Sequence, residues 1–211
     1  MKIHAIAALA CAALVLAGCA NPERSRDLGN PAIAGKVLAQ QACSLCHGVR
    51  GVSLSPNFPN LAGQQPAYVI AQLTEFRSHS RQDPEGFEYM WGVTRRLTDD
   101  QIAAIATYYA AQPPAHQGAE GAVAAIEVGR KLFLDGAPDR GIPACSSCHG
   151  DHGQGLATFP RLAGQHTDYI AKQLRVFQRT EQRPDGPAMK AVAHNLTPAD
   201  IEGAAAFLQT L

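Results

Sequence analysis

The chain has 211 residues, of which 46% are hydrophobic and 17% are charged, and its 18 Lys and Arg residues balance its 18 Asp and Glu residues. This length suits two small domains, since single domains usually contain ~50 to 200 residues. The charges divide almost evenly between the two halves, which argues against a nucleic-acid-binding protein with a basic patch.

Residues 1–18 have the pattern of a secretion signal, because their apolar run is too short and too early for a spanning helix. The run ends in Leu16-Ala17-Gly18-Cys19, which resembles the lipobox of bacterial lipoproteins. Cleavage before Cys19 would leave it as a lipid-modified N-terminus, and Ala20 in the next position favours the outer membrane by analogy with bacterial sorting. Ordinary cleavage after Ala20 is the alternative and would give a soluble periplasmic protein.

Residues 19–31 are polar and lack helical periodicity, so they are predicted to form a flexible tether. From Ala32 a short helix is expected to lead into Cys43-Ser44-Leu45-Cys46-His47. In a Cys-x-x-Cys-His sequence on a helical turn, two sulfurs can bond to the vinyl groups of one haem, and the histidine lies under the iron. Cys43 and Cys46 are therefore predicted to attach a haem c, and His47 to be its proximal iron ligand.

A Cys-x-x-Cys pair also occurs in dithiol redox centres and as half of a zinc site. Neither of these needs a histidine directly after the second cysteine, and the motif recurs as Cys145-Ser146-Ser147-Cys148-His149. A second haem c is therefore predicted on Cys145 and Cys148, with His149 as its proximal ligand. Cys11 lies in the signal and Cys19 in the lipobox, so no cysteine remains for a disulfide.

Loops and amphipathic helices alternate after the first haem motif. Residues 48–60 are rich in Gly, Pro, Ser and Asn and predict a loop around the haem edge, followed by a helix with apolar positions between 69 and 76. A further loop is expected from Ser78 to Met90. Thr98 and Gln101 form a predicted capping box for a helix that runs to about Gln112.

The second half repeats the first. Residues 161–174 match residues 60–73 at an offset of 101, and the haem motifs are offset by 102. This pattern indicates a tandem duplication of one helical haem domain. The predicted fold is all-α, with domains at 32–112 and 123–211 joined by a Pro- and Gly-rich linker at 113–122.

The second axial ligand decides whether each iron is open or closed, and methionine sulfur is the favoured candidate. Apart from Met1, the only methionines are Met90 and Met189, which stand at corresponding places just before the last helix of each repeat. A lone methionine would be core filler, but the duplication favours iron ligation. His79 and His194 are the fallback ligands, although neither has a counterpart in the other repeat.

Two prolines are candidates for orienting the proximal histidines. Pro59 and Pro160 follow His47 and His149 by twelve and eleven residues, each directly after a phenylalanine. Their carbonyl oxygens could accept the imidazole N–H and so strengthen the bond to iron. The alternative is that they are ordinary turn prolines.

From about Ala32 to Leu211 the chain resembles cytochrome c4, the dihaem tandem class I cytochromes c of bacterial periplasms. The resemblance is carried by both Cys-x-x-Cys-His-Gly motifs and by the repeated Leu-Ala-Gly-Gln sequences at 61–64 and 162–165. It implies two all-helical domains, each with one His/Met haem, with both haems near the domain interface. It also implies single-electron transfer between a quinol-oxidising complex and a terminal oxidase or reductase. The lipobox departs from the soluble members and puts free diffusion in doubt.

The sequence contains no constellation of acid, base and nucleophile, so an electron-transfer protein rather than an enzyme is predicted. One alternative is the cytochrome subunit of a periplasmic dehydrogenase, which would leave no local motif. A dihaem peroxidase is disfavoured because it requires an open iron, while a methionine is available in both repeats. A haem-based sensor is disfavoured because no output domain is found.

Overall fold

The computed structural model describes residues 21–84, 86–118, 121–179, 183 and 186–211, and this part of the chain is helical with no strand. The predicted signal (1–18) and Cys19 lie outside the described residues. The first half contains η1 (Pro22–Arg24), α2 (Gly35–Leu38), η2 (Ala39–Cys43), α3 (Ser44–His47), α4 (Pro66–Arg77), η3 (Gly86–Met90), α5 (Trp91–Thr94) and α6 (Asp99–Ala110). The second half contains α7 (Val123–Asp135), η4 (Pro138–Arg140), α8 (Ser146–His149), α9 (Thr167–Arg179), α10 (Pro187–Ala193) and α11 (Pro198–Thr210).

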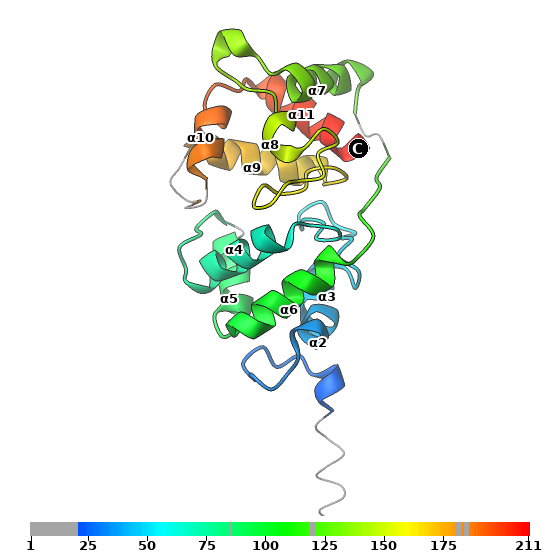
Figure 1. The fold of residues 1–211 in the computed structure, drawn as a ribbon, viewed down its shortest axis with the longest axis vertical. Helices are drawn as coiled ribbons and strands as arrows, with labels where there is room; N and C mark the ends of the chain where they lie inside the picture. The colour runs from blue at the N-terminus through cyan, green and yellow to red at the C-terminus, as the bar shows by residue number, and fades with distance from the viewer. Residues whose placement is uncertain (1–20, 85, 119–120, 180–182, 184–185) are drawn as a thin grey trace, which may run out of the picture.

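Each half has its own hydrophobic core. One cluster is centred on the fully buried Tyr109 of α6, and the other on Phe133 of α7, which is 1% exposed. The two halves are stacked along the long axis of the molecule, with α2 to α6 in one and α7 to α11 in the other (Figure 1). They are called the first and second domain below.

The first and last helices of each domain pack closely because small residues lie at their crossing. In the second domain, a Cβ added to Gly129 of α7 would lie 1.9 Å from the carbonyl oxygen of Gly203 in α11. In the first domain, a Cβ on Gly35 of α2 would lie 2.5 Å from the carbonyl oxygen of Gln101 in α6. In both domains, therefore, a glycine allows the backbones of two helices to approach closely.

Both final helices begin with a reciprocal cap, which the sequence predicts for Thr98 and Gln101. The Thr98 hydroxyl accepts the backbone N–H of Gln101, and the Gln101 side chain accepts the N–H of Thr98. Thr197 and Asp200 make the same reciprocal pair at the start of α11, where Pro198 occupies the first turn. These pairs satisfy backbone donors that a helix N-terminus otherwise leaves free.

The structure differs from the sequence prediction between Ser78 and Met90. The last part of this segment, Gly86–Met90, is a helical turn that continues directly into α5. The turn packs closely on α4, since a Cβ on Gly86 would lie 2.6 Å from the Phe76 ring. Local polarity predicts a loop here, but tertiary packing prevails over that weak preference.

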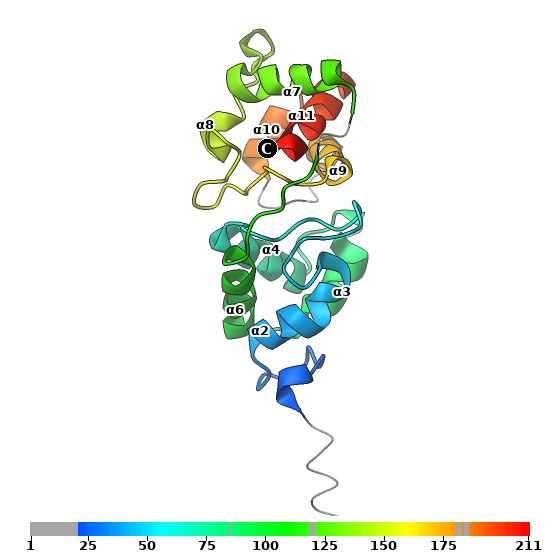
Figure 2. The same ribbon diagram turned by 90° about the vertical axis from the view of Figure 1, so that its right-hand side faces the viewer.

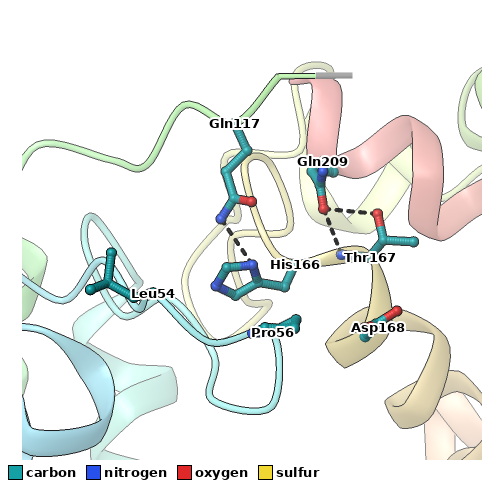
Figure 3. A pocket seen from close by; sticks show the side chains of 7 residues that line it. All are labelled: Leu54, Pro56, Gln117, His166, Thr167, Asp168 and Gln209. Carbon is teal, nitrogen blue, oxygen red and sulfur yellow. Dashed lines mark hydrogen bonds between the residues drawn. The ribbon is translucent and has the colours of Figure 1, made fainter. Parts of the chain in front are cut away.

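After α6, the described linker residues up to 118 run from the first domain to the second along the side that faces the viewer in Figure 2. Two hydrogen bonds attach the linker to the second domain. The Gln117 amide donates to Nδ1 of the buried His166 at 3.1 Å, and the Gln209 amide donates to the Gly118 carbonyl. Figure 3 shows these side chains around a small pocket that Leu54 of the first domain also lines. The linker therefore helps to hold the two domains together.

A buried polar cluster also joins the domains. Arg81 and Arg183 occupy corresponding places in the two repeats, and each donates to the carboxamide oxygens of both Gln72 and Gln173. Asp83 pairs with Arg81 at 2.6 Å, and all five side chains are at least nine-tenths buried. Satisfied buried networks of this kind fix one arrangement of the parts they connect.

Among the described residues, no helix is both long and apolar enough to cross a bilayer.

Candidate haem sites

The first Cys-x-x-Cys-His motif lies on a continuous helical segment formed by η2 and α3. His47 is the last residue of α3 and is buried, and its Nδ1 lies 2.9 Å from the Pro59 carbonyl oxygen. A carbonyl can only accept, so Nδ1 carries the proton and Nε2 keeps its lone pair free for a metal. Burial lowers the pKa of His47 and so favours the neutral ring. The hydrogen bond to Pro59 raises this pKa and partly opposes the effect of burial.

The second motif has the same geometry. His149 ends α8, is buried, and places its Nδ1 2.9 Å from the Pro160 carbonyl oxygen. Phe58 and Phe159 lie edge-on to His47 and His149, with ring centroids 6.1 and 6.0 Å apart respectively. The bonds expected of Pro59 and Pro160 are therefore present, and each fixes the orientation of one imidazole.

None of the four cysteines of the two motifs takes part in a disulfide, and Cys43 and Cys145 are half-buried while Cys46 and Cys148 are exposed. Burial raises the pKa of both Cys43 and Cys145 to about 11, so these thiols are neutral near pH 7. A reactive dithiol needs a thiol with a depressed pKa, so neither Cys43 nor Cys145 fits the reactive thiol of such a centre.

The zinc alternative also lacks support. In the described part of the chain, no three His, Cys, Asp or Glu side chains are grouped as a metal site requires. Two free thiols one helical turn apart, next to a histidine held by Nδ1, are the donor set that a covalently bound haem needs. The residues present therefore fit haem c in both domains.

The structure places Met90 and Met189 in equivalent elements. Met90 is the last residue of η3 and packs, half-buried, against the core of the first domain. Met189 is half-buried in α10, the corresponding helix of the second domain. Both therefore lie on the segment that precedes the capped final helix, as the sequence predicts.

The two fallback histidines have other surroundings. The His79 ring is stacked between the rings of Phe87 and Trp91, with centroids 4.4 and 4.6 Å away. His194 is exposed and caps the C-terminal end of α10. In the sequence, neither histidine has a histidine at the corresponding place of the other repeat.

Comparison with known proteins settles the family. The Cytochrome c family model matches residues 32–111 and again residues 126–211. A cytochrome c4 from Stutzerimonas stutzeri is 40% identical over 84% of this chain and 86% of its own length. This chain belongs to the cytochrome c4 family. The crystal structure of reduced recombinant cytochrome c4 from Pseudomonas stutzeri superposes with a TM-score of 0.76 at 38% identity, covering 84% of this chain and 96% of that one.

A further relative bears on the partner. A thiosulfate dehydrogenase electron acceptor from Stutzerimonas stutzeri is 35% identical, over 80% of this chain and 78% of its own. As a member of the cytochrome c4 family, the present protein is an electron-transfer cytochrome with two tandem domains. It holds two covalently bound haems c, one on Cys43 and Cys46 and one on Cys145 and Cys148.

Sequence reasoning missed one set of residues at these sites. Gln64 and Gln165 are buried, and the side chain of each crosses to the other domain. Gln165 accepts the backbone N–H of Asn60, and Gln64 accepts that of Arg161. Their signal in the sequence is the Leu-Ala-Gly-Gln repeat, which the chain carries once per domain. The repeat indicates the duplication, but spacing alone does not show that the glutamines cross between the domains.

Proposed function

We propose that this cytochrome carries single electrons in a bacterial respiratory chain, between a quinol-oxidising complex and a terminal oxidase or reductase. The observation that carries the proposal is the equivalence of the two sites: each has a buried, neutral histidine held through Nδ1, and each has one methionine at the corresponding place. Two closed irons suit electron transfer, since a peroxidase or a sensor needs an open coordination position.

We propose that His47 and Met90 would bind the iron of the first haem, and that His149 and Met189 would bind that of the second. The bound haem would supply a one-electron change at iron, with a thioether ligand favouring a high potential. The Pro59 and Pro160 carbonyls hold the imidazoles in place, so little rearrangement accompanies a change of charge.

The domain boundaries and the location of the protein belong to the same proposal. We infer domains at 32–112 and 123–211, a linker at 113–122, and a tether at 19–31 behind a signal at 1–18. A lipid on Cys19 would anchor the protein on the periplasmic side of the cell envelope, with the outer membrane favoured. The tether would keep both haem domains within reach of membrane-bound partners.

A redox titration of the purified holoprotein, followed optically and by carbon monoxide binding, tests the proposal. We expect two high-potential waves, the weak near-infrared band of methionine-ligated ferric haem, and no spectral change with carbon monoxide. A single low-potential wave together with carbon monoxide binding would mean an open iron and would favour an enzyme or a sensor.

A second candidate function is to accept electrons directly from a periplasmic dehydrogenase as its cytochrome subunit. It is favoured by the similarity to a protein named as a thiosulfate dehydrogenase electron acceptor. Affinity purification from membranes and from periplasm separates the two functions. A respiratory carrier would be recovered alone or with membrane complexes, whereas a subunit would be recovered in fixed ratio with a dehydrogenase.

A further inference from the structure

Gln64 and Gln165 each clamp one residue of the opposite domain. The Gln165 carboxamide accepts the Asn60 N–H at 2.8 Å and donates to the Asn60 carbonyl at 2.9 Å. In the other direction, Gln64 accepts the Arg161 N–H at 2.6 Å and donates to the Arg161 carbonyl at 3.0 Å. Both glutamines are about 95% buried, at 6% and 5% exposure, so water does not compete effectively for these bonds.

The clamped residues are the ones that directly follow Pro59 and Pro160. The peptide group between Pro59 and Asn60 contains both the carbonyl that accepts from His47 and the N–H that donates to Gln165. One amide therefore links the proximal histidine of the first domain to a glutamine of the second. The peptide between Pro160 and Arg161 links His149 to Gln64 in the same way.

Hydrogen bonds on the two ends of one amide strengthen each other. When the N–H donates, electron density moves toward the carbonyl oxygen, which becomes a better acceptor. A stronger bond from the imidazole Nδ1–H makes Nε2 a stronger donor to iron. A stronger donor stabilises the ferric state more than the ferrous state and so lowers the potential.

We propose that Gln165 tunes the potential of the haem in the first domain, and that Gln64 tunes that of the haem in the second. The effect is crossed: each domain supplies the residue that sets the strength of the other domain's proximal ligand. These glutamines are positioning residues that act through an amide and a histidine. The proposal needs the covalent haems and the proximal histidines, but neither the partners nor the methionine ligands.

The expected effect is modest and has a defined sign. A cooperative gain of about 10–30% in a hydrogen bond between neutral groups changes the ferric-to-ferrous ratio by up to about twofold. For one electron, this corresponds to at most roughly 18 mV. Gln165→Leu removes the acceptor at similar volume, so we expect the first domain's potential to rise and the second domain's to stay unchanged. Gln64→Leu should give the reverse pattern.

The experiment is a redox titration of the full-length holoprotein followed by NMR. Trp91, the single tryptophan of the chain, lies in the first domain, and its indole signal identifies the wave of that domain's haem. The Nδ1–H signals of His47 and His149 in the ferrous protein report the strength of each imidazole hydrogen bond. With Gln165→Leu, we expect the His47 signal to move upfield and the His149 signal to stay.

Gln65→Leu is the matched control. Gln65 follows Gln64 and also crosses the interface, where its amide donates to the Gln154 carbonyl at 3.0 Å, but it does not touch either proline peptide. We expect it to leave both potentials and both Nδ1–H signals unchanged. The arginine cluster at the interface is intact in all three variants, which favours retention of the domain arrangement.

The outcomes separate tuning from a general loosening of the interface. If Gln165→Leu moves only the second domain's potential, moves both potentials together, or leaves both unchanged as Gln65→Leu is expected to do, the proposal is wrong. If Gln165→Leu does not fold, Gln165→Glu keeps the acceptor oxygen and the chain length. This variant should shift the first domain's potential downward, and an upward shift or no shift would overturn the proposal.

Discussion

Replacing Asp200 by asparagine should destabilise the second domain by removing one well-placed charge. The Asp200 carboxylate is 9% exposed and accepts from the Arg140 guanidinium at 2.5 and 3.1 Å and from Thr197 at the start of α11. The hydrogen bond from Arg140 is the largest cause that lowers its pKa, from 3.8 to about 2. This shift corresponds to at most about 2.4 kcal/mol of folding free energy at pH 7. Since Arg140 is 34% exposed, solvent screening reduces the expected loss to about 1–2 kcal/mol.

The lowered pKa of Asp200 determines how its contribution to stability changes with pH. The folded pKa lies below the unfolded value, so the carboxylate stabilises the protein fully above about pH 5 and progressively less as the pH falls toward 2. Urea unfolding of wild type and Asp200→Asn, followed by haem absorbance between pH 3 and 7, should show a difference that shrinks with acidification. Asp99→Asn is the control, since the Asp99 side chain is 88% exposed in its pair with Arg77 and should contribute 0–1 kcal/mol. No difference at pH 7, or one independent of pH, would refute the electrostatic reasoning.

Met90→Ala and Met189→Ala should each open one iron, so that carbon monoxide binds one haem per chain and one wave of the redox titration shifts downward. An unchanged spectrum and midpoint in both variants would contradict the ligand assignment. Gly129→Ala should destabilise the second domain by about 2–3 kcal/mol in urea unfolding, because its Cβ would lie 1.9 Å from the Gly203 carbonyl. Gly92→Ala is the control, because nothing lies within 4 Å of the added Cβ, and a cost similar to that of Gly129→Ala would argue against the close helix contact. Cys19→Ser should release the protein from the membrane fraction into the periplasmic extract; retention in membranes on immunoblots would exclude the lipid anchor.

The local chemistry of the haem sites could be predicted because it is carried by short sequences. Cys43, Cys46 and His47 must share one helical turn for two sulfurs to reach one haem, so the spacing specifies both cofactor and attachment. The cap at Thr98 was predictable for the same reason, since a capping box spans only four residues. The hydrogen bonds from His47 and His149 to the proline carbonyls were expected from the repeat, although turn prolines were an equal alternative.

The segment that ends at Met90 shows the limit of such reasoning. Its composition predicts a loop, whereas packing of Gly86 on Phe76 accompanies a helical turn there. The position of Met90 relative to the final helix could still be predicted, because duplication gives a second example at Met189. A repeated sequence therefore constrains position along the chain better than it constrains local conformation.

The sequence by itself determined the cofactor, the number of domains, the helical class and the cysteines that attach each haem. Only the tertiary structure decided how the two domains meet. Gln64 and Gln165 look alike in the sequence, and either could have bonded within its own domain. Their partners, Arg161 and Asn60, lie 97 and 105 positions away, and such contacts follow from the stacking of two folded domains rather than from any local pattern.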